Sequence, residues 1–306
     1  MPGTKDIKNH INSVKDTQKI TNAMYLIAST KLQKAKAELD KTRPYFNALR
    51  TEIKRIFRTV DNVDNRYFYP STGEHELPGA YGYLVITADK GLAGAYNQNV
   101  IKQAVSMMKE HEDNKLFVVG EYGRQYFAMR NIPIEQSFLY SAQNPTIQRA
   151  RDISAILLDM FNKGELSKIF IIYTDFSSGL SNEPRTARIL PFHPAQFKTP
   201  EGEEEVDSPF EFQPSVEQVL DNMIPGYITG FVYSALVDSF CSEQNSRMTA
   251  MDSANTNAQK LLDELSMEYN HIRQSAITQE ITEISSGARG QKKNTVKTGG
   301  AVKNDR

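Results

Sequence analysis

The feature that most constrains the fold is a narrow stripe of apolar residues near the end of the chain. Between Ser242 and Ile284 the apolar side chains recur every three or four residues, the spacing of one face of an α-helix. They are Met251, Ala254, Ala258, Leu261, Leu265, Tyr269, Ile272 and Ala276. We expect helix over residues 215–287, far longer than an ordinary globular helix. A helix of that length with one narrow apolar face requires a partner.

The start of the chain supplies that partner. Its apolar residues step along one helical face, with the lysines on the other faces. They are Ile7, Ile11, Val14, Thr21, Met24, Ala28, Leu32, Ala35 and Leu39. Pro44 lacks a backbone donor and could kink this helix, but the pattern resumes from Leu49 to Val60. We therefore predict helix over residues 1–60, paired antiparallel with residues 215–287 as a coiled coil.

The middle of the chain has a different organisation. Residues 61–82 contain five prolines and glycines and form a connector, and residues 193–214 form an acidic, proline-containing linker. Between them, residues 83–192 alternate β-rich runs with helical segments, which predicts a Rossmann-like α/β domain with buried parallel strands. The expected strands are residues 83–87, 116–119 and 168–173, with weaker ones at 134–139 and 185–190, and the expected helices are 97–112, 121–130 and 146–163.

The antiparallel pairing leaves the end of the second long helix without a partner in the chain. Residue 1 should lie opposite about residue 272, yet an apolar stripe continues through Ile277, Ile281 and Ile284. Such a stripe indicates contact with another molecule. Gly287 is a plausible residue for ending the helix, and we expect residues 288–306, with six lysines and arginines, to be a disordered basic tail.

Composition excludes several classes of site. One cysteine, Cys241, rules out an internal disulfide, and five scattered histidines give no metal-site spacing, so we expect no metal and no cofactor. No apolar run is long enough to span a membrane. Residues 1–60 carry 13 lysines and arginines against five acids, an excess of eight positive charges. That end is either a solvated helix face or a surface for an acidic partner. Nucleic-acid binding is a weak alternative because aromatic residues are scarce there.

Two loops have some features of an active site. Asp89–Asn97 follows the first strand and precedes a helix, where α/β proteins bind phosphates, but its two glycines do not make a nucleotide-binding motif. A structural turn is the favoured interpretation. Asp175, Ser177 and Ser178 follow another strand, yet they are common turn residues and no histidine is near in sequence. We expect no catalytic residue in this chain.

Three blocks, in this order, resemble one family. They are KDIKNHINSVKDTQKITNAMYLIASTKLQKA at residues 5–35, ITADKGLAGAYNQNV at 86–100, and SEQNSRMTAMDSANTNAQK with RQSAITQEITEI toward the end. Together they are similar to the gamma subunit of F-type ATP synthase over nearly the whole chain to Gly287. The resemblance implies a non-catalytic rotor shaft that couples ion-driven rotation of a membrane ring to ATP synthesis or hydrolysis. A free-standing coiled-coil adaptor, or a nucleotide-dependent α/β enzyme, are the alternatives.

The resemblance also implies partners and contact residues. The partners are the alpha and beta subunits of the catalytic ring, the epsilon subunit and the membrane c-ring, with no nucleic acid and no membrane insertion. The implied place is peripheral, at the cytoplasmic face of a bacterial inner membrane. Carried over by motif, the expected stator contacts are Lys19, Thr21, Met24, Lys31, Gln274, Thr278 and Glu280. Arg247, beside a stripe of alanines, is either solvated or a further stator contact.

Overall fold

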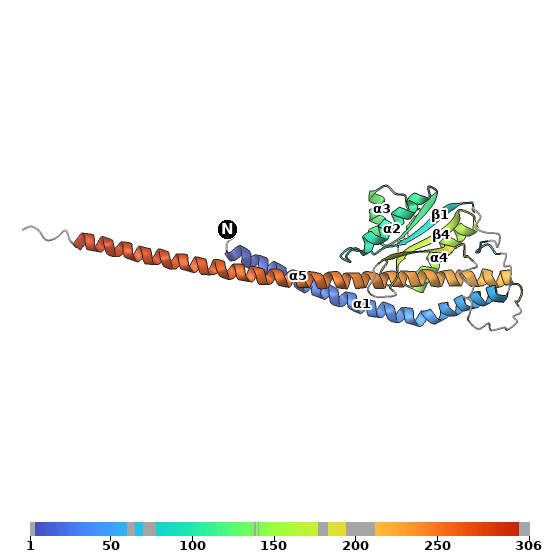
Figure 1. Ribbon diagram of the computed structural model, residues 1–306, viewed down its shortest axis with the longest axis horizontal. Helices are drawn as coiled ribbons and strands as arrows, with labels where there is room; N and C mark the ends of the chain where they lie inside the picture. The colour runs from blue at the N-terminus through green and yellow to red at the C-terminus, as the bar shows by residue number, and fades with distance from the viewer. Residues whose placement is uncertain are drawn as a thin grey trace, which may run out of the picture. The chain divides into compact units, whose positions relative to one another are not determined.

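The computed structural model describes residues 4–59, 65–69, 78–137, 139, 141–176, 183–193 and 212–299. Two helices dominate the chain (Figure 1): α1 spans Thr4–Thr59 and α5 spans Val216–Gly299. The chain divides into two compact units, and each long helix contributes to both. One unit is residues 24–250 and contains the α/β domain. The other comprises residues 1–23 and 251–306 and contains only helix among its described residues.

The α/β domain is built on a five-stranded sheet in the order β3-β2-β1-β4-β5. Its strands are β1 (Ala80–Ile86), β2 (Asn114–Val119), β3 (Gln136–Ser137), β4 (Leu166–Thr174) and β5 (Pro184–Leu190). The first four are parallel and β5 is antiparallel to β4. The predicted α/β domain is confirmed, and all five strands lie within a few residues of their expected positions. Only the last two residues of β5 are buried, which explains its weaker apolar signal.

Helices cover both faces of the sheet. Tyr83 and Val85 of β1 point to the face that packs against α2 (Tyr96–Glu110) and α3 (Glu121–Met129). Leu84 and Ile86, the alternate residues, point to the face that packs against α4 (Ile147–Asn162), α1 and α5. The central strands are therefore buried on both sides, which is why their sequences are continuous apolar runs.

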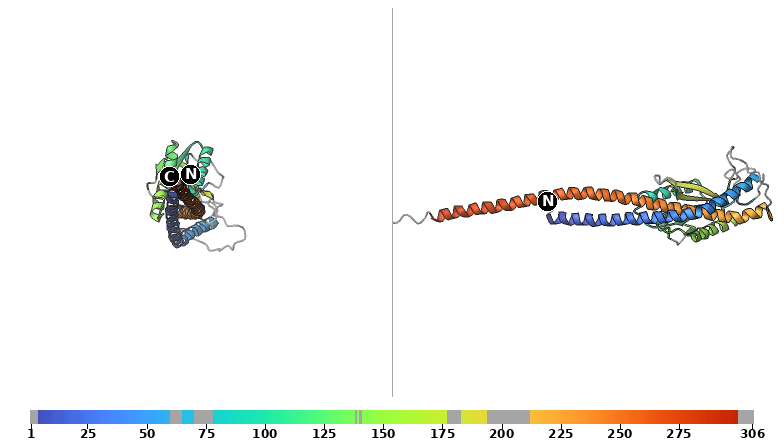
Figure 2. Two further views of the ribbon diagram at one scale, coloured as in Figure 1. Left: turned by 90° about the vertical axis from the view of Figure 1, so that its left-hand side faces the viewer. Right: turned by 90° about the horizontal axis from the view of Figure 1, so that it is seen from below.

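In the residue 24–250 unit, α1 and α5 lie side by side beneath the sheet (Figures 1 and 2). They approach closely at Gly230, where an added Cβ would lie 2.0 Å from Cδ1 of Phe46. Only glycine allows the two helices this separation. Pro44 and Pro225 both lie inside helices, so neither ends its element. Ser215 caps α5, since its Oγ accepts a hydrogen bond from Gln218 N at 3.3 Å.

The second unit pairs the start of α1 with the later part of α5. Gln18 Nε2 donates to Gln259 Oε1 at 3.3 Å and Thr21 Oγ1 donates to Asn255 Oδ1, so the two segments run antiparallel as predicted. The predicted apolar face of α1 is buried or half-buried at every position. On α5 two positions of the predicted face are exposed: Leu261, where the neighbouring Leu262 is buried instead, and Ala276, which lies beyond Ile272. From residue 273 to 289 every side chain is exposed.

The end of α5 corrects one expectation. We predicted that Gly287 ends the helix and that residues 288–306 are disordered, but α5 continues to Gly299. Alanine, arginine, glutamine and lysine predominate directly after Gly287, and these residues favour helix strongly enough to carry it past Gly287 and Gly290. Most of the expected connector and acidic linker, and residues 300–306, lie outside the described residues.

Candidate functional site

The carboxyl ends of β1 and β4 are where an α/β sheet of this order would bind a ligand. Strand β1 is central, and the chain crosses to β2 on one side and to β4 on the other. Crevices at such switch points are the usual ligand sites of open parallel sheets. The loop Asp89–Asn97, which we considered as a nucleotide site, begins at this edge. The hydrogen bonds at this edge therefore decide whether its polar groups are available to a ligand or are bonded within the chain.

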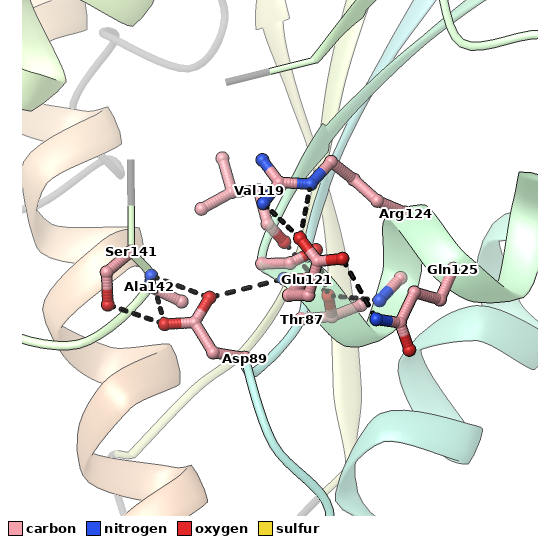
Figure 3. A network of polar contacts seen from close by, with 10 residues as sticks. Thr87, Asp89, Val119, Glu121, Arg124, Gln125, Ser141 and Ala142 are labelled. Carbon is pink, nitrogen blue, oxygen red and sulfur yellow. Dashed lines mark hydrogen bonds and ion pairs between the residues drawn. The ribbon is translucent and has the colours of Figure 1, made fainter. Parts of the chain in front are cut away.

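Asp89 fixes this edge to a distant loop (Figure 3). Its carboxylate accepts hydrogen bonds from Ser141 Oγ at 2.5 Å, from Ala142 N at 2.9 Å and from Glu121 N at 3.2 Å. Burial opposes ionisation of this carboxyl, but the hydrogen bonds outweigh it and lower the pKa of Asp89 below its usual value. The oxygens that could have held a ligand are bonded within the chain.

The junction between β1 and β2 is closed in the same way. Thr87 Oγ1 donates to Val119 O at 2.9 Å and accepts from Gly123 N at 3.0 Å. Gly120 has a φ of 95°, and an added Cβ would lie 2.2 Å from Thr87 O. Glu121, which a dinucleotide site would direct to a ribose, forms an ion pair with Arg124 instead.

The turn after β1 is held by Asn97. Its Oδ1 accepts from Ala88 N at 2.9 Å and its Nδ2 donates to Lys90 O at 3.3 Å. Leu92 and Gly94 have φ values of 61° and 55°, so the turn is tightly wound. These contacts fit the favoured prediction of a structural turn.

Side chains of helix α5 bond to further backbone groups at this edge. Thr174 N, at the end of β4, donates to Ser239 Oγ at 3.3 Å, and Ser242 Oγ donates to Thr174 O at 3.4 Å. Arg247 Nη2 donates to Gly91 O at 3.1 Å. The long helix therefore binds the strand ends that would otherwise face a ligand.

Arg247 also forms a buried ion pair. Its Nη1 lies 2.6 Å from Glu243 Oε1, and the two side chains are 10% and 2% exposed. Burial raises the pKa of Glu243, and Arg247 acts in the opposite direction. Burial and the nearby Glu243 also raise the pKa of Tyr96, which is buried beside this pair. Sequence reasoning identified Arg247 as a polar residue but missed Glu243, although their spacing of four residues on a helix was the available signal.

The expected stator contacts in the helical unit are exposed or half-buried. Lys19 is exposed and pairs with Asp16 at 2.9 Å, and Thr21 is half-buried with its hydroxyl bonded to Asn255. Gln274, Thr278 and Glu280 are all exposed on α5. Their role as contacts remains a prediction.

The other expected contacts lie in the residue 24–250 unit. Met24 is half-buried, and Lys31 Nζ donates to Gln143 Oε1 at 2.8 Å. Arg247 is bonded to Glu243 and Gly91, as above, so an outside partner would have to share or break those contacts. Among the described residues no group of three or more His, Cys, Asp or Glu side chains could hold a metal ion. No helix in the part of the chain that the structure describes is long and apolar enough to cross a membrane.

Fold and site together define a class of protein. The α/β domain has its ligand edge bonded to a long helix, and that helix carries exposed isoleucines beyond its coiled-coil partner. This is a chain in which a globular α/β domain is inserted between two long helices.

Comparison with known proteins gives the family. Residues 3–290 match the ATP synthase family. The chain is 42% identical to the ATP synthase gamma chain of Caldanaerobacter subterraneus subsp. tengcongensis, over 94% of this chain and 99% of that one. It is 36% identical to the sodium ion specific ATP synthase gamma chain of Acetobacterium woodii, over 93% and 97%. The chain belongs to the ATP synthase gamma chain family.

Solved structures agree on the fold. A chain of the rotor of the Euglena gracilis mitochondrial ATP synthase superposes with a TM-score of 0.63 at 16% identity, covering 90% of this chain and 98% of that one. A chain of the central stalk and c-ring structure from Tetrahymena thermophila superposes with a TM-score of 0.59 at 23% identity, covering 77% and 99%. The predicted fold class, long terminal helices around an inserted α/β domain, is confirmed.

Proposed function

We propose that this chain is the rotor shaft of an F-type ATP synthase, turning inside a ring of alpha and beta subunits. Its α/β domain would lie toward the epsilon subunit and the membrane c-ring. Ion flow turns the c-ring, the shaft turns with it, and the shaft surface moves each catalytic site of the ring through its binding states. The complex would be peripheral to the cytoplasmic face of a bacterial inner membrane.

The observation that carries this proposal is the exposed apolar stripe on α5. Ile277, Ile281 and Ile284 are 46%, 61% and 73% exposed, and no described residue covers them. An exposed apolar stripe is costly in water and is typical of a binding surface. A rotor tip seated in a bearing formed by other subunits would cover these isoleucines.

The basic end of the chain suggests how the ring is engaged. Residues 1–60 carry an excess of eight positive charges, and Lys19 is exposed on that surface. Complementary charge guides and orients protein contacts. We propose that Lys19, Thr21, Met24 and Lys31 meet an acidic lever of the beta subunits. Gln274, Thr278 and Glu280 would meet the bearing at the tip, and Arg247 would be a contact only if its internal bonds are shared.

We also propose that the chain itself has no catalytic site. The contacts of the Asp89 carboxylate, Thr174 N and Gly91 O support this, because these groups at the ligand edge of the sheet are bonded within the chain. Nucleotides would bind to the other subunits of the complex. ATP titrated into the purified chain should produce no saturable heat signal. Micromolar binding, lost when Asp89 is changed to Asn, would restore the enzyme hypothesis.

The experiment that tests the rotor is purification of the tagged chain from its own cells, with identification of the bound subunits. We expect alpha, beta and epsilon subunits in the complex. A solitary monomer or homodimer as the only cellular form would favour the adaptor alternative.

The variant Met24→Lys tests coupling, with Met24→Leu as its matched control. Met24 is half-buried at the proposed lever contact, so an added charge should impair ATP-driven ion pumping while the complex still assembles. Leucine conserves volume and should be close to neutral. Unchanged coupling in the lysine variant would remove Met24 from the contact set.

A further inference from the structure

A cavity of about 430 Å³ lies within the residue 24–250 unit, between α1, α5 and the segment that leads into α4. Its volume is in the range of small-molecule sites in proteins. Half of its lining residues are apolar, and they come from all three segments. They are Ala35, Pro145, Ile147, Tyr233, Val237 and Phe240. Of the contacts proposed for the rotor function, only Lys31 lines this cavity.

The apolar walls favour a ligand with a hydrophobic body. Tyr233, Val237 and Phe240 are 4%, 1% and 3% exposed, so the floor provided by α5 is fixed in the core. Ile147, at the start of α4, is 39% exposed although it lines the cavity. An apolar group seated there would cover part of that side chain, which stabilises the complex in proportion to the area buried.

The charged residues of the cavity favour an anion. Lys31 and Lys34 of α1 both line it, and the only acid in the lining is Glu38. Glu38 is already paired, since Lys41 Nζ lies 2.7 Å from its Oε1. Lys34 is exposed, and no hydrogen bond or ion pair joins it to the described part of the chain. Positive charge is therefore available on the α1 side of the cavity, whose α5 side is apolar.

The N-terminus of α4 adds to the positive potential of the cavity. Thr146 caps the helix by accepting from Arg149 N at 3.3 Å, and the first turn contains no acidic residue. The positive end of the helix dipole, next to the lining residues Thr146 and Ile147, is therefore not neutralised by a carboxylate of the first turn. The potential from the helix dipole is small by itself, and it is positive, as is the potential from the two lysines.

We infer that this cavity binds an amphiphilic monoanion, a molecule with an apolar chain or ring and one carboxylate. The apolar body would lie against Tyr233, Val237 and Phe240, and the carboxylate would face Lys34 and Lys31. A polyanion is disfavoured because only one side of the cavity is charged, and a cation because both lysine charges are positive. The inference goes beyond the proposed rotor function and does not rest on it.

The test uses decanoate carrying a photoreactive diazirine on its chain, with the purified full-length chain and concentrations below micelle formation. We expect saturable labelling within residues 31–42, 144–147 and 233–240, mapped by mass spectrometry. Unmodified decanoate should compete, whereas decanol and decyltrimethylammonium should compete poorly. Labelling that falls elsewhere, that never saturates, or that all three amphiphiles suppress equally would overturn the inference.

Variants separate charge from folding. Ile147→Glu and Ile147→Gln introduce side chains of the same size at an exposed position, and an acid is favourable in the first turn of a helix, so both should fold. We expect the glutamate variant to bind decanoate roughly tenfold more weakly than the glutamine variant, a difference of about 1.4 kcal/mol. Lys34→Gln should weaken binding about threefold to fivefold, without changing the melting temperature of the free chain. Equal affinities in the two Ile147 variants would contradict an anion site.

Discussion

The two units of this chain use the same pair of helices in different ways. In the residue 24–250 unit, α1 and α5 are packed into the core of the α/β domain, and polar side chains such as Arg247 and Glu243 are buried and paired. In the unit formed by residues 1–23 and 251–306, burial is confined to a narrow seam, and beyond Ile272 every described side chain to residue 289 is exposed. One sequence pattern is therefore buried in a core in one unit and left exposed in the other, where we propose that it binds partners.

The largest expected effect comes from breaking the buried ion pair. Arg247→Met leaves Glu243 buried without its partner and should lower the free energy of unfolding by about 3–5 kcal/mol. Lys19→Met removes the ion pair of Lys19 with Asp16, in which the two side chains are 78% and 69% exposed. It should change the free energy of unfolding by less than about 0.5 kcal/mol. Urea denaturation of the two variants measures the contrast.

A second variant controls for lost packing. In Arg247→Met combined with Glu243→Gln no charge is left buried, so much of the stability should return. The contrast between the units would fail if Arg247→Met cost no more than Lys19→Met.

The next largest effect on stability comes from replacing glycine. We expect the same substitution, glycine to alanine, to have opposite effects in the two units. Gly230→Ala places a Cβ 2.0 Å from Phe46 Cδ1, so the helices must separate, and we expect a loss of about 2–3 kcal/mol. Gly287→Ala meets no atom within 4 Å inside a helix and should stabilise it by about 0.5–1 kcal/mol. Thermal unfolding followed by circular dichroism compares them. A stabilising alanine at position 230 would mean that the helices do not approach closely there.

A smaller effect depends on pH. Burial, with the nearby Asp175 carboxylate, raises the pKa of Asp238 to about 7, and Arg43 and Arg185 oppose the shift. Between the ordinary value of 3.8 and about 7, the folded chain holds a proton that the unfolded chain releases. Stability from this group is therefore full below pH 3.8 and is lost as pH rises to about 7.

Removing that ionisation should reverse the loss. We expect Asp238→Asn to raise the unfolding free energy by about 1–2 kcal/mol at pH 8 and to change it little at pH 4. Asp252→Asn, at an exposed position of the other unit, controls for loss of a surface charge. Denaturation at both pH values measures the difference. Equal changes at pH 4 and pH 8 would show that Asp238 does not titrate in this range.

Sequence patterns predicted the elements well because their signals are local or periodic. The apolar faces of α1 and α5 and the continuous runs of β1, β2 and β4 require only the spacing of residues. The predicted loss of burial near Ile272 also agrees with the structure, since it follows from helix length alone.

The hydrogen bonds at the carboxyl edge of the sheet could not be predicted in the same way. Asp89 bonds to Ser141 and Ala142, more than fifty residues away, and α5 reaches back to Gly91 from Arg247. Nothing in the spacing of these residues brings them together, because the strand order does so. Gly287 failed as a helix end for another reason, since one glycine is weak evidence when good helix formers follow it.

The smallest effect on folding tests the proposed bearing. Ile281 is 61% exposed, so Ile281→Ser should change the unfolding free energy of the free chain by less than about 0.5 kcal/mol. Leu265, which is 8% exposed in the seam of the same helix, should lose about 2 kcal/mol on the same substitution. In the assembled complex the proposed partner surface would cover Ile281. The Ile281→Ser variant should therefore weaken association with the ring subunits more than Leu265→Ser does, although its own fold is intact. Quantitative pull-down of both variants at equal folded concentration measures this. Normal association of the Ile281→Ser chain would mean that the exposed stripe does not bind the ring subunits. The two units would then differ in how far their side chains are buried but not in whether they bind partners.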